Sequence, residues 1–493
     1  MHTNGRGFGE EMNRISIKAN LLFRIAYELL SIITPIITAP YVARVLGADG
    51  VGVYSYLSSI ASFFMMFSVL GTVGYGTREI ARIRDDKSIT SKTFWEIELL
   101  TVYTTVICSI AWVILSLCYR EYTIYCIVLI PSLLSCVFDI SWLYTGLEQV
   151  KYTVIVNMIF RVLSVVAILC FVKSKNDLVL YFCINSFSVL FGNISSWIFL
   201  PKLIIRIPIE SLEIKKHFRK TIVYFIPTIA ISIYTVLDKA LLGLLIIDKA
   251  VSGYYEQADK LIRIIKAATY SAVNGVLGAR QSYLFEKKDN IKMKMYIESS
   301  LNMLLFVEFG CVFGLIGISD LFVPFFFGDG YEPVITLLCF MTPLLVIIAI
   351  SNTLGAQYLT PSGQIKKATV YLSIGSAINL ITNILLIPTY KAIGAVIASI
   401  IAEIVICLLF IHSSKSVIDV RTILLLCYKR LIAGSVMLII LRHIENTGIV
   451  FLDIMIKILG GGSTFVILLL LMKDDALNQL IVYIRKKLKS YDI

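Results

Sequence analysis

Apolar runs of about 18–25 residues recur from one end of this chain to the other, and only short polar breaks separate them. Helices of this length are what a hydrocarbon core about 30 Å thick requires, because in lipid every backbone polar group must be satisfied within its own segment. Only 16% of the residues are charged, whereas soluble domains contain about one-quarter charged residues. The pattern therefore predicts an all-α polytopic membrane protein.

The runs and their breaks predict about fourteen transmembrane helices. The expected helices cover residues 15–43, 51–77, 93–118, 122–147, 152–172, 178–200, 221–247, 251–279, 296–319, 333–357, 368–388, 392–412, 422–441 and 449–472. The polar segment before the first helix has no cleavable signal pattern and leaves both Met1 and Met12 open as the start of translation.

The positive charge is distributed very unevenly between alternate breaks. One set of breaks holds the great majority of the 45 Lys and Arg residues, including the clusters at 78–92, 202–220 and 280–294. The other set holds only Arg44, Arg120, Lys173, Lys175, Lys249, Lys391 and Arg442. By the positive-inside rule, both termini lie in the cytoplasm. The net charge of +12 is thus a consequence of topology, and we expect no nucleic-acid partner.

Two short motifs occur twice in the same order, each at a corresponding break. The segment 52–56 (GVYSY) opens the second helix and 253–257 (GYYEQ) opens the eighth, while 143–151 is echoed by 358–366. Because six helices separate the copies, two six-helix lobes of one orientation are expected, related by an axis along the membrane normal.

The repeat defines three expected parts of the chain. They are an N-terminal lobe at 1–210, a C-terminal lobe at 211–414, and two additional transmembrane helices with a basic cytoplasmic tail at 415–493.

Long polar faces on the first, seventh and eighth expected helices are the strongest functional signal. An ionisable side chain in hydrocarbon costs about 2.5–3.5 kcal/mol on insertion scales, so a stripe of such residues indicates a water-filled cavity. The candidate substrate-binding residues are Asn20, Arg24, Arg161, Lys239, Lys260, Arg263, Lys266, Tyr270 and Asn274. Their acidic neighbours, candidates for coupling to H⁺ or Na⁺, are Glu28, Asp238, Glu256 and Asp259.

An alternative reading is that these charges pair with one another and hold helices together. The i,i+4 spacing of Glu256 with Lys260 and of Asp259 with Arg263 allows it. For the isolated acids Asp139, Glu298, Glu308 and Glu403, such a structural role is the expectation.

The small excess of bases in the stripes favours an anionic substrate, because Arg and Lys form charge-assisted hydrogen bonds with phosphate. The ten Cys residues form no CxxC pair and only four His residues occur. We therefore expect no metal site and no cofactor.

Two signatures resemble those of polysaccharide-biosynthesis oligosaccharide flippases. The first is residues 40–47 (PYVARVLG), followed by Gly71, Tyr75-Gly76 and the run 78–81 (REIA). The second is Asp238-Lys239 with the later run 253–260 (GYYEQADK). This polysaccharide transporter family belongs to the multidrug/oligosaccharidyl-lipid/polysaccharide exporter superfamily, which also contains drug antiporters of the MATE type and lipid-linked peptidoglycan-precursor flippases.

The resemblance implies a flippase, not an enzyme, in the bacterial cytoplasmic (inner) membrane. Its substrate would be an undecaprenyl-diphosphate-linked oligosaccharide for capsule, exopolysaccharide or O-antigen synthesis, moved by alternating access of two lobes around a cationic cavity. Arg24, Lys260 and Arg263 would contact the diphosphate, and a polymerase and glycosyltransferases would be partners. A cation-coupled drug antiporter and a polytopic polysaccharide polymerase remain as alternatives; the short outer breaks disfavour the polymerase.

Overall fold

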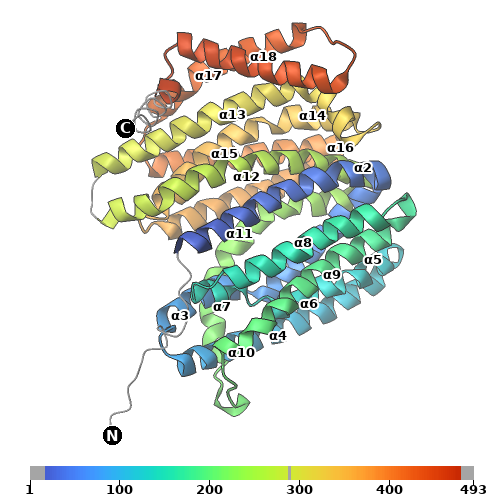
Figure 1. The fold of residues 1–493 in the computed structure, drawn as a ribbon, viewed down its shortest axis with the longest axis vertical. Helices are drawn as coiled ribbons and strands as arrows, with labels where there is room; N and C mark the ends of the chain where they lie inside the picture. Colours follow the sequence, from blue (N-terminus) through green and yellow to red (C-terminus); the bar gives the residue numbers. More distant parts are fainter. Residues whose placement is uncertain (1–16, 287–289, 479–493) are drawn as a thin grey trace. The chain divides into compact units, whose positions relative to one another are not determined.

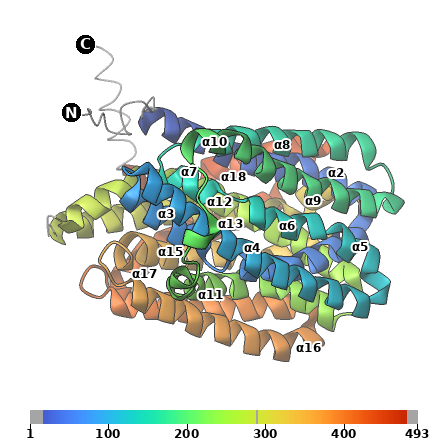
Figure 2. The same ribbon diagram turned by 90° about the horizontal axis from the view of Figure 1, so that it is seen from below.

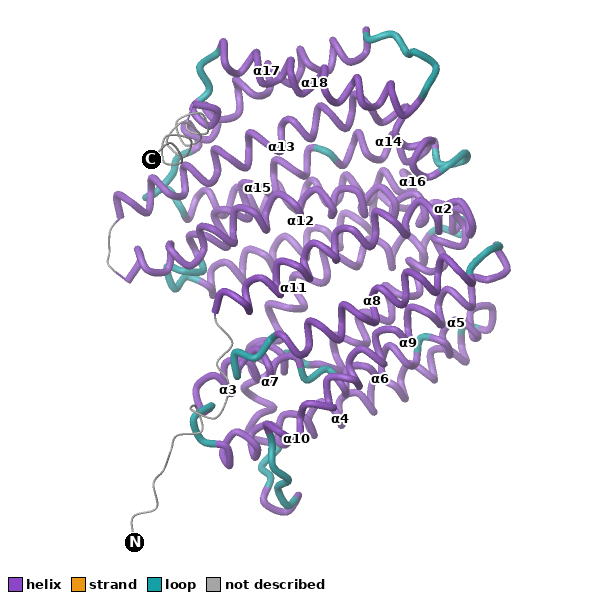
Figure 3. The backbone as a smooth tube through the Cα atoms, viewed as in Figure 1, coloured by secondary structure: helices purple, strands orange, loops and turns teal. Residues whose placement is uncertain are grey.

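Long helices account for nearly all of the regular structure (Figures 1 and 3). The structure, a computed structural model, describes residues 17–286 and 290–478, and no strand occurs within them. The chain divides into two compact units, Met1–Gly243 and Leu244–Ile493. The prediction of an all-α polytopic fold is confirmed.

The N-terminal unit contains the helices up to most of α11. Its elements are α2 (Ile17–Val69), α3 (Thr72–Ile83), α4 (Lys87–Cys118), η1 (Arg120–Tyr122), α5 (Thr123–Val128), α6 (Ile130–Phe138), α7 (Ser141–Gly146), α8 (Lys151–Phe171), η2 (Lys175–Asp177), α9 (Leu178–Ser196), η3 (Trp197–Phe199), α10 (Leu200–Leu203), η4 (Ile209–Ser211) and α11 (Lys215–Leu245).

The C-terminal unit follows the end of α11. Its elements are α12 (Lys249–Glu286), α13 (Asn290–Phe327), α14 (Glu332–Met341), α15 (Pro343–Leu354), η5 (Gly355–Leu359), α16 (Ile365–Ser413), α17 (Val420–His443) and α18 (Val450–Leu471).

Ten helices in the described part of the chain are long and apolar enough to cross a membrane, or eleven if the bent pair within α11 is one span. Two of the long helices are kinked, α2 at Gly47 and α16 at Lys391, so each offers two apolar segments. The charged helix α12 is not among the ten. A membrane protein with at least ten apolar spans is therefore established, while the exact number of fourteen stays a prediction.

Helix α4 shows how the units suit a membrane. Its outer face carries exposed apolar side chains such as Ile107 and Leu117, whereas its buried face carries Glu98, Thr101 and Thr105. Lipid offers no hydrophobic advantage to burying leucine, so small and polar residues between helices provide the association instead. The same logic explains the close approach of α3 to α7 (Figure 2), where the Trp142 ring occupies the space that a side chain at Gly76 would fill.

The two turns predicted as repeat copies share their hydrogen bonds. In the N-terminal unit, the amide of Gln149 donates to the Tyr144 carbonyl at 2.8 Å. In the C-terminal unit, the amide of Gln364 donates to the Leu359 carbonyl at 2.9 Å. At the same constant spacing in sequence, Glu148 and Gly363 both adopt positive φ, 59° and 75°. Matching backbone geometry at matching positions supports an internal repeat.

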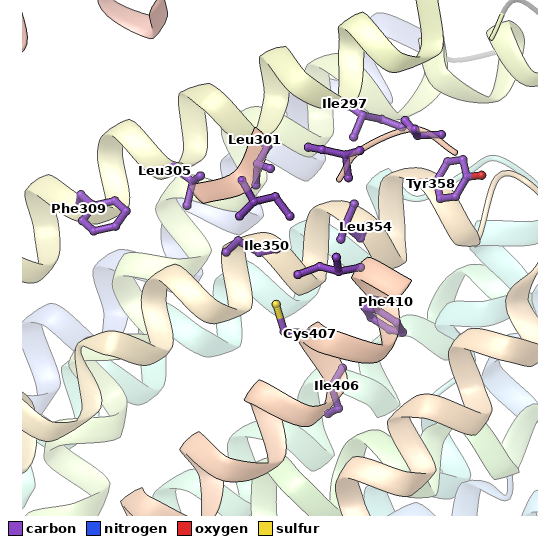
Figure 4. Packing of buried hydrophobic residues seen from close by; sticks show 14 of the residues in the cluster. Ile297, Leu301, Leu305, Phe309, Ile350, Leu354, Tyr358, Ile406, Cys407 and Phe410 are labelled. Carbon is purple, nitrogen blue, oxygen red and sulfur yellow. The ribbon is translucent and has the colours of Figure 1, made fainter. Parts of the chain in front are cut away.

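The main apolar core of the C-terminal unit lies between α13, α15 and α16, with α17 against its outer side (Figure 4). Leu301 and Leu305 of α13 meet Leu354 of α15 and Ile406 of α16, and all four are at most 1% exposed. This core holds α13, α15 and α16 against one another.

Helix α17 packs against α13 through a fully buried charge. The Arg430 guanidinium donates to Asn302 of α13 and pairs with Asp474, beyond the end of α18, at 3.1 Å. This contact ties the last two helices into the C-terminal unit, beside α13 (Figure 1).

Candidate functional site

The first part of α12 carries a network of ion pairs between residues four to seven positions apart on the helix. Asp248 caps the helix start, because its Oδ1 accepts a hydrogen bond from the Ala250 amide at 3.0 Å. About four turns later, the Arg263 guanidinium pairs with Glu256 at 3.0 Å and with Asp259 at 3.1 Å. The Lys260 ammonium lies 3.7 Å from the same Glu256 carboxylate.

The ion-paired network of Glu256, Asp259, Lys260 and Arg263 is open on one side. Two acids face two bases, and the Arg263 side chain is 47% exposed while the carboxylates beside it are 13% and 20% exposed. The guanidinium uses Nε and Nη2 in these ion pairs. A guanidinium fixed at two of its nitrogens is held in one orientation, so its outward edge is preorganised for a bidentate anion such as phosphate.

The second part of α12 has a different environment. Thr269 donates a hydrogen bond to Oε1 of Glu308 on α13 at 2.7 Å. Lys266 and Tyr270 interact electrostatically with both Glu308 and Glu403, the latter on α16. The predicted polar stripe on α12 therefore has two parts. Lys266 and Tyr270 interact with buried acids of neighbouring helices and are not part of the network around Arg263.

In the N-terminal unit, Arg161 of α8 joins the polar face of α2. Its Nη1 donates to Ser31 at 3.0 Å, and its guanidinium lies over the Tyr27 ring at 6.0 Å. Glu28, which lies on α2 between Tyr27 and Ser31, is exposed. The structure thus places Arg161 beside the polar face that the sequence predicts for the first helix.

Three predicted residues fall where side chains are not described. Asn20 and Arg24 lie in α2 and Asn274 lies in α12, but their side chains are outside the described part of the chain. Asp238 and Lys239 of α11 are buried, with 3% and 6% exposure, and both have interaction partners.

Glu308 and Glu403, for which the sequence predicts a structural role, are both buried and meet residues of neighbouring helices. Glu308 is 0% exposed and Glu403 is 6% exposed. The available signal was the absence of Lys and Arg three or four residues away on either side. A helical carboxylate with no such neighbour must find its partner on another helix. By contrast, Glu298 does pair within its helix, with Lys294 at 3.8 Å.

Glu96, a buried acid with several polar partners, was not among the residues predicted from the sequence. The Glu96 carboxylate of α4 contacts His217 at 2.7 Å, Lys216 at 3.1 Å and the Glu213 amide at 2.9 Å. The other ring nitrogen of His217 bonds the Tyr75 hydroxyl at 2.8 Å. This cluster joins α3 and α4 to the start of α11, and its complete pairing marks it as a structural joint. Among the described residues, no group of three or more His, Cys, Asp or Glu could hold a metal ion.

Comparisons with known proteins agree with the resemblance seen in the motifs. The chain is 22% identical over 413 residues to a protein of Escherichia coli (strain K12) named "Putative O-antigen transporter", and the match covers 82% of this chain and 98% of that protein. A Shigella dysenteriae protein of the same name is 24% identical, with 81% and 100% covered.

Two solved structures share the fold. The inward closed conformation of the lipid II flippase MurJ superposes with a TM-score of 0.71 at 19% identity, covering 93% of this chain and 99% of that one. The MATE multidrug transporter DinF-BH in complex with R6G gives 0.52 at 14% identity, covering 82% and 98%. At these identities the likeness concerns the fold alone, which is the flippase and MATE type expected from the sequence.

The family itself follows from a match to its sequence model. The model described as "Polysaccharide biosynthesis protein" matches residues 17–285, more than half of the 493-residue chain. The matched region includes both signatures that suggested the resemblance. The chain belongs to the polysaccharide biosynthesis protein family.

Proposed function

We propose that this protein is a flippase that moves lipid-linked oligosaccharide units across the membrane for surface polysaccharide synthesis. The observation that carries the proposal is the family match together with the nearly full-length similarity to two proteins named as O-antigen transporters. The MurJ-like fold supports the same class. The protein acts as a transporter and not as an enzyme.

The finer features of the proposal concern substrate and cell. The carrier is undecaprenyl diphosphate, the glycan is a capsule, exopolysaccharide or O-antigen repeat unit, and the membrane is the bacterial inner membrane. Both termini lie in the cytoplasm, as the distribution of Lys and Arg between alternate breaks favours. Glycosyltransferases that build the repeat unit and a polymerase that consumes it are the partners.

Arg263 is the residue that we assign to the diphosphate. It is half exposed and held by Glu256 and Asp259, so little side-chain entropy is lost when it binds an anion. Lys260, one turn away, adds a second positive charge with 21% exposure. Transport proceeds by alternating access, in which the diphosphate binds from the cytoplasmic side and leaves on the other.

Replacing Arg263 tests this assignment. A charge-assisted hydrogen bond is worth about 1.5–3 kcal/mol, so Arg263→Ala should reduce flipping by about tenfold to a hundredfold. Arg263→Lys should retain part of the activity, because it keeps the charge but loses the planar fork. The measurement is transbilayer movement of a lipid-linked oligosaccharide in proteoliposomes, alongside restoration of surface polysaccharide in a deletion strain.

Arg421→Ala is the matched control, since Arg421 is exposed at the start of α17. It should leave flipping unchanged. Normal flipping by a stably inserted Arg263→Ala protein would disprove the role of Arg263. A deletion strain that loses drug tolerance but keeps its surface polysaccharide would instead favour the cation-coupled drug antiporter.

A further inference from the structure

Glu308 has an oxygen atom that nothing in the described structure satisfies. Its Oε1 accepts the hydrogen bond of Thr269 at 2.7 Å. Its Oε2 is buried and has no hydrogen-bond partner among the described residues. A buried charged oxygen without a partner costs several kcal/mol, so this atom calls for a ligand or a proton.

The groups around Glu308 come from three neighbouring helices. Helix α12 contributes Lys266 and Tyr270, and α16 contributes Glu403, with which both of them also interact. Helix α15 contributes Ser351, which is 4% exposed and hydrogen-bonds Glu403. All of these residues belong to the C-terminal unit.

The remaining titratable groups nearby are thiols and one arginine already in use. Cys311 of α13 lies near Glu308, while Cys407 of α16 lies near Glu403. On α17, Cys427 faces Cys407, and Arg430 is bound by Asn302 and Asp474. The surroundings are otherwise the apolar core of Figure 4, whose members include the sequence neighbours Phe309 and Ile350.

The charges of this cluster do not balance unless a cation joins it. Two carboxylates and one ammonium give a net charge of minus one in an apolar setting. No direct ion pair between Lys266 and either carboxylate occurs among the described residues, so the lysine offsets the acids without occupying Oε2. One proton on Glu308 makes the cluster neutral and turns Oε2 into a donor.

We propose that Glu308 and Glu403 form a proton-binding site within the C-terminal unit, in which one exchangeable proton resides on Oε2 of Glu308. The Lys266 ammonium already places one positive charge beside both carboxylates and disfavours a metal cation there, so we assign the missing positive charge to a proton. This site is separate from the acids of the open network on α12. That proton exchange drives transport rests on the proposed function, whereas the site itself does not.

A second buried carboxylate helps to define what makes Glu308 special. Glu98 of α4 also has an unpartnered oxygen, but among the described residues its electrostatic neighbour is another acid, Asp139, and not a cation. A lysine shared between two acids makes both protonation states accessible, and the Glu308 cluster has one in Lys266, whereas the described surroundings of Glu98 do not.

Infrared spectroscopy of the full-length protein in lipid nanodiscs tests the site without any substrate. The probe is the proton itself, and the signal is the C=O stretching band of a protonated carboxyl group, recorded through a series of pH values. We expect one titrating band in the wild type, its loss in Glu308→Gln, and a shifted midpoint in Glu403→Gln. Glu298→Gln on the same helix, whose side chain is 35% exposed, should leave the band unchanged.

Thr269→Val keeps both carboxyl groups and removes only the hydroxyl that contacts Glu308, so it should shift the midpoint even if Glu308→Gln fails to fold. A band that survives Glu308→Gln, or a midpoint that Thr269→Val leaves in place, would overturn the proposal. A midpoint that moves with sodium concentration at constant ionic strength would overturn it in favour of a sodium site. Because no lipid-linked substrate is used, a flippase assay that fails would not alter the reading of this experiment.

Discussion

The two parts of α12 keep charge in an apolar bundle by opposite means. Glu256, Asp259, Lys260 and Arg263 neutralise one another on a single helix and remain partly exposed. Lys266, one turn further on, has no acid three or four residues away in sequence and interacts with buried carboxylates of α13 and α16. The first arrangement contains ion pairs within one helix, whereas the second depends on packing between helices and is one positive charge short.

The contrast distinguishes ligand binding by exposed charges from protonation of buried charges, two roles that a polar helix face in the sequence does not distinguish. A self-neutralised network can present one of its members to a ligand without destabilising the fold, because exposed ion pairs contribute little. A buried cluster with an unbalanced charge is costly unless its protonation changes. Removing charges from each should therefore have unequal effects.

The largest loss of stability is expected from replacing Glu96. Its carboxylate is as buried as that of Glu308, but it has ion-pair partners, as Glu256 does. Glu96→Ala leaves His217, Lys216 and the Glu213 amide without their common acceptor. Breaking a buried charge network in this way costs about 3–5 kcal/mol. Thermal unfolding in detergent measures the loss. Glu79→Ala, which removes a surface pair with Arg82, should cost less than about 1 kcal/mol; equal losses would contradict the argument.

An intermediate loss of stability is expected for Lys266→Met. The variant leaves two buried carboxylates without their cation, but they can take up protons, so we expect a loss of about 1–3 kcal/mol. The loss should be greatest in alkaline solution, where the acids cannot be neutralised by protonation, and smallest in acid. Unfolding curves recorded across the pH range measure it.

A neutral version of the same cluster provides the control. Combining Lys266→Met with Glu308→Gln and Glu403→Gln removes all three charges together and should recover stability and abolish its pH dependence. If the triple variant is less stable than Lys266→Met alone, the cluster is held by ion pairing and not by charge balance.

The smallest effect on stability is expected in the open network. Glu256→Gln combined with Asp259→Asn should cost less than about 1 kcal/mol for each pair lost, and the cost should shrink further at high salt. Unfolding at two ionic strengths measures it. A loss that matches Glu96→Ala would show that the network is a structural joint, which would remove the contrast between the two parts of α12.

The sequence predicted those features that depend on residues close together in the chain. Run length and the charge of alternate breaks predict the helices, because a bilayer imposes both. The repeated motifs anticipate the paired turns, where Gln149 and Gln364 make equivalent backbone hydrogen bonds. The i,i+4 spacing on α12 anticipates the pairing of Arg263 with Asp259, which the structure contains.

What the sequence could not supply depends on packing between helices. Periodicity places Lys266 and Tyr270 on the same face as Arg263, yet they face acids more than 35 residues further along the chain. Which isolated carboxylate meets which base is decided by how α12, α13 and α16 lie against each other. For this reason the sequence alone predicts no more than a structural role for Glu308.

The burial of Arg430 has a consequence for the synthesis and membrane insertion of the chain. An arginine in mid-helix costs about 2.5–3.5 kcal/mol on insertion scales. One of its partners, Asn302, precedes it by 128 residues, whereas the other, Asp474, follows by 44. Asn302 is therefore synthesised before Arg430, and Asp474 after it. Arg430 can contact Asn302 once α17 lies against α13, but its ion pair with Asp474 can form only after α18, which lies between them in the sequence, has been made.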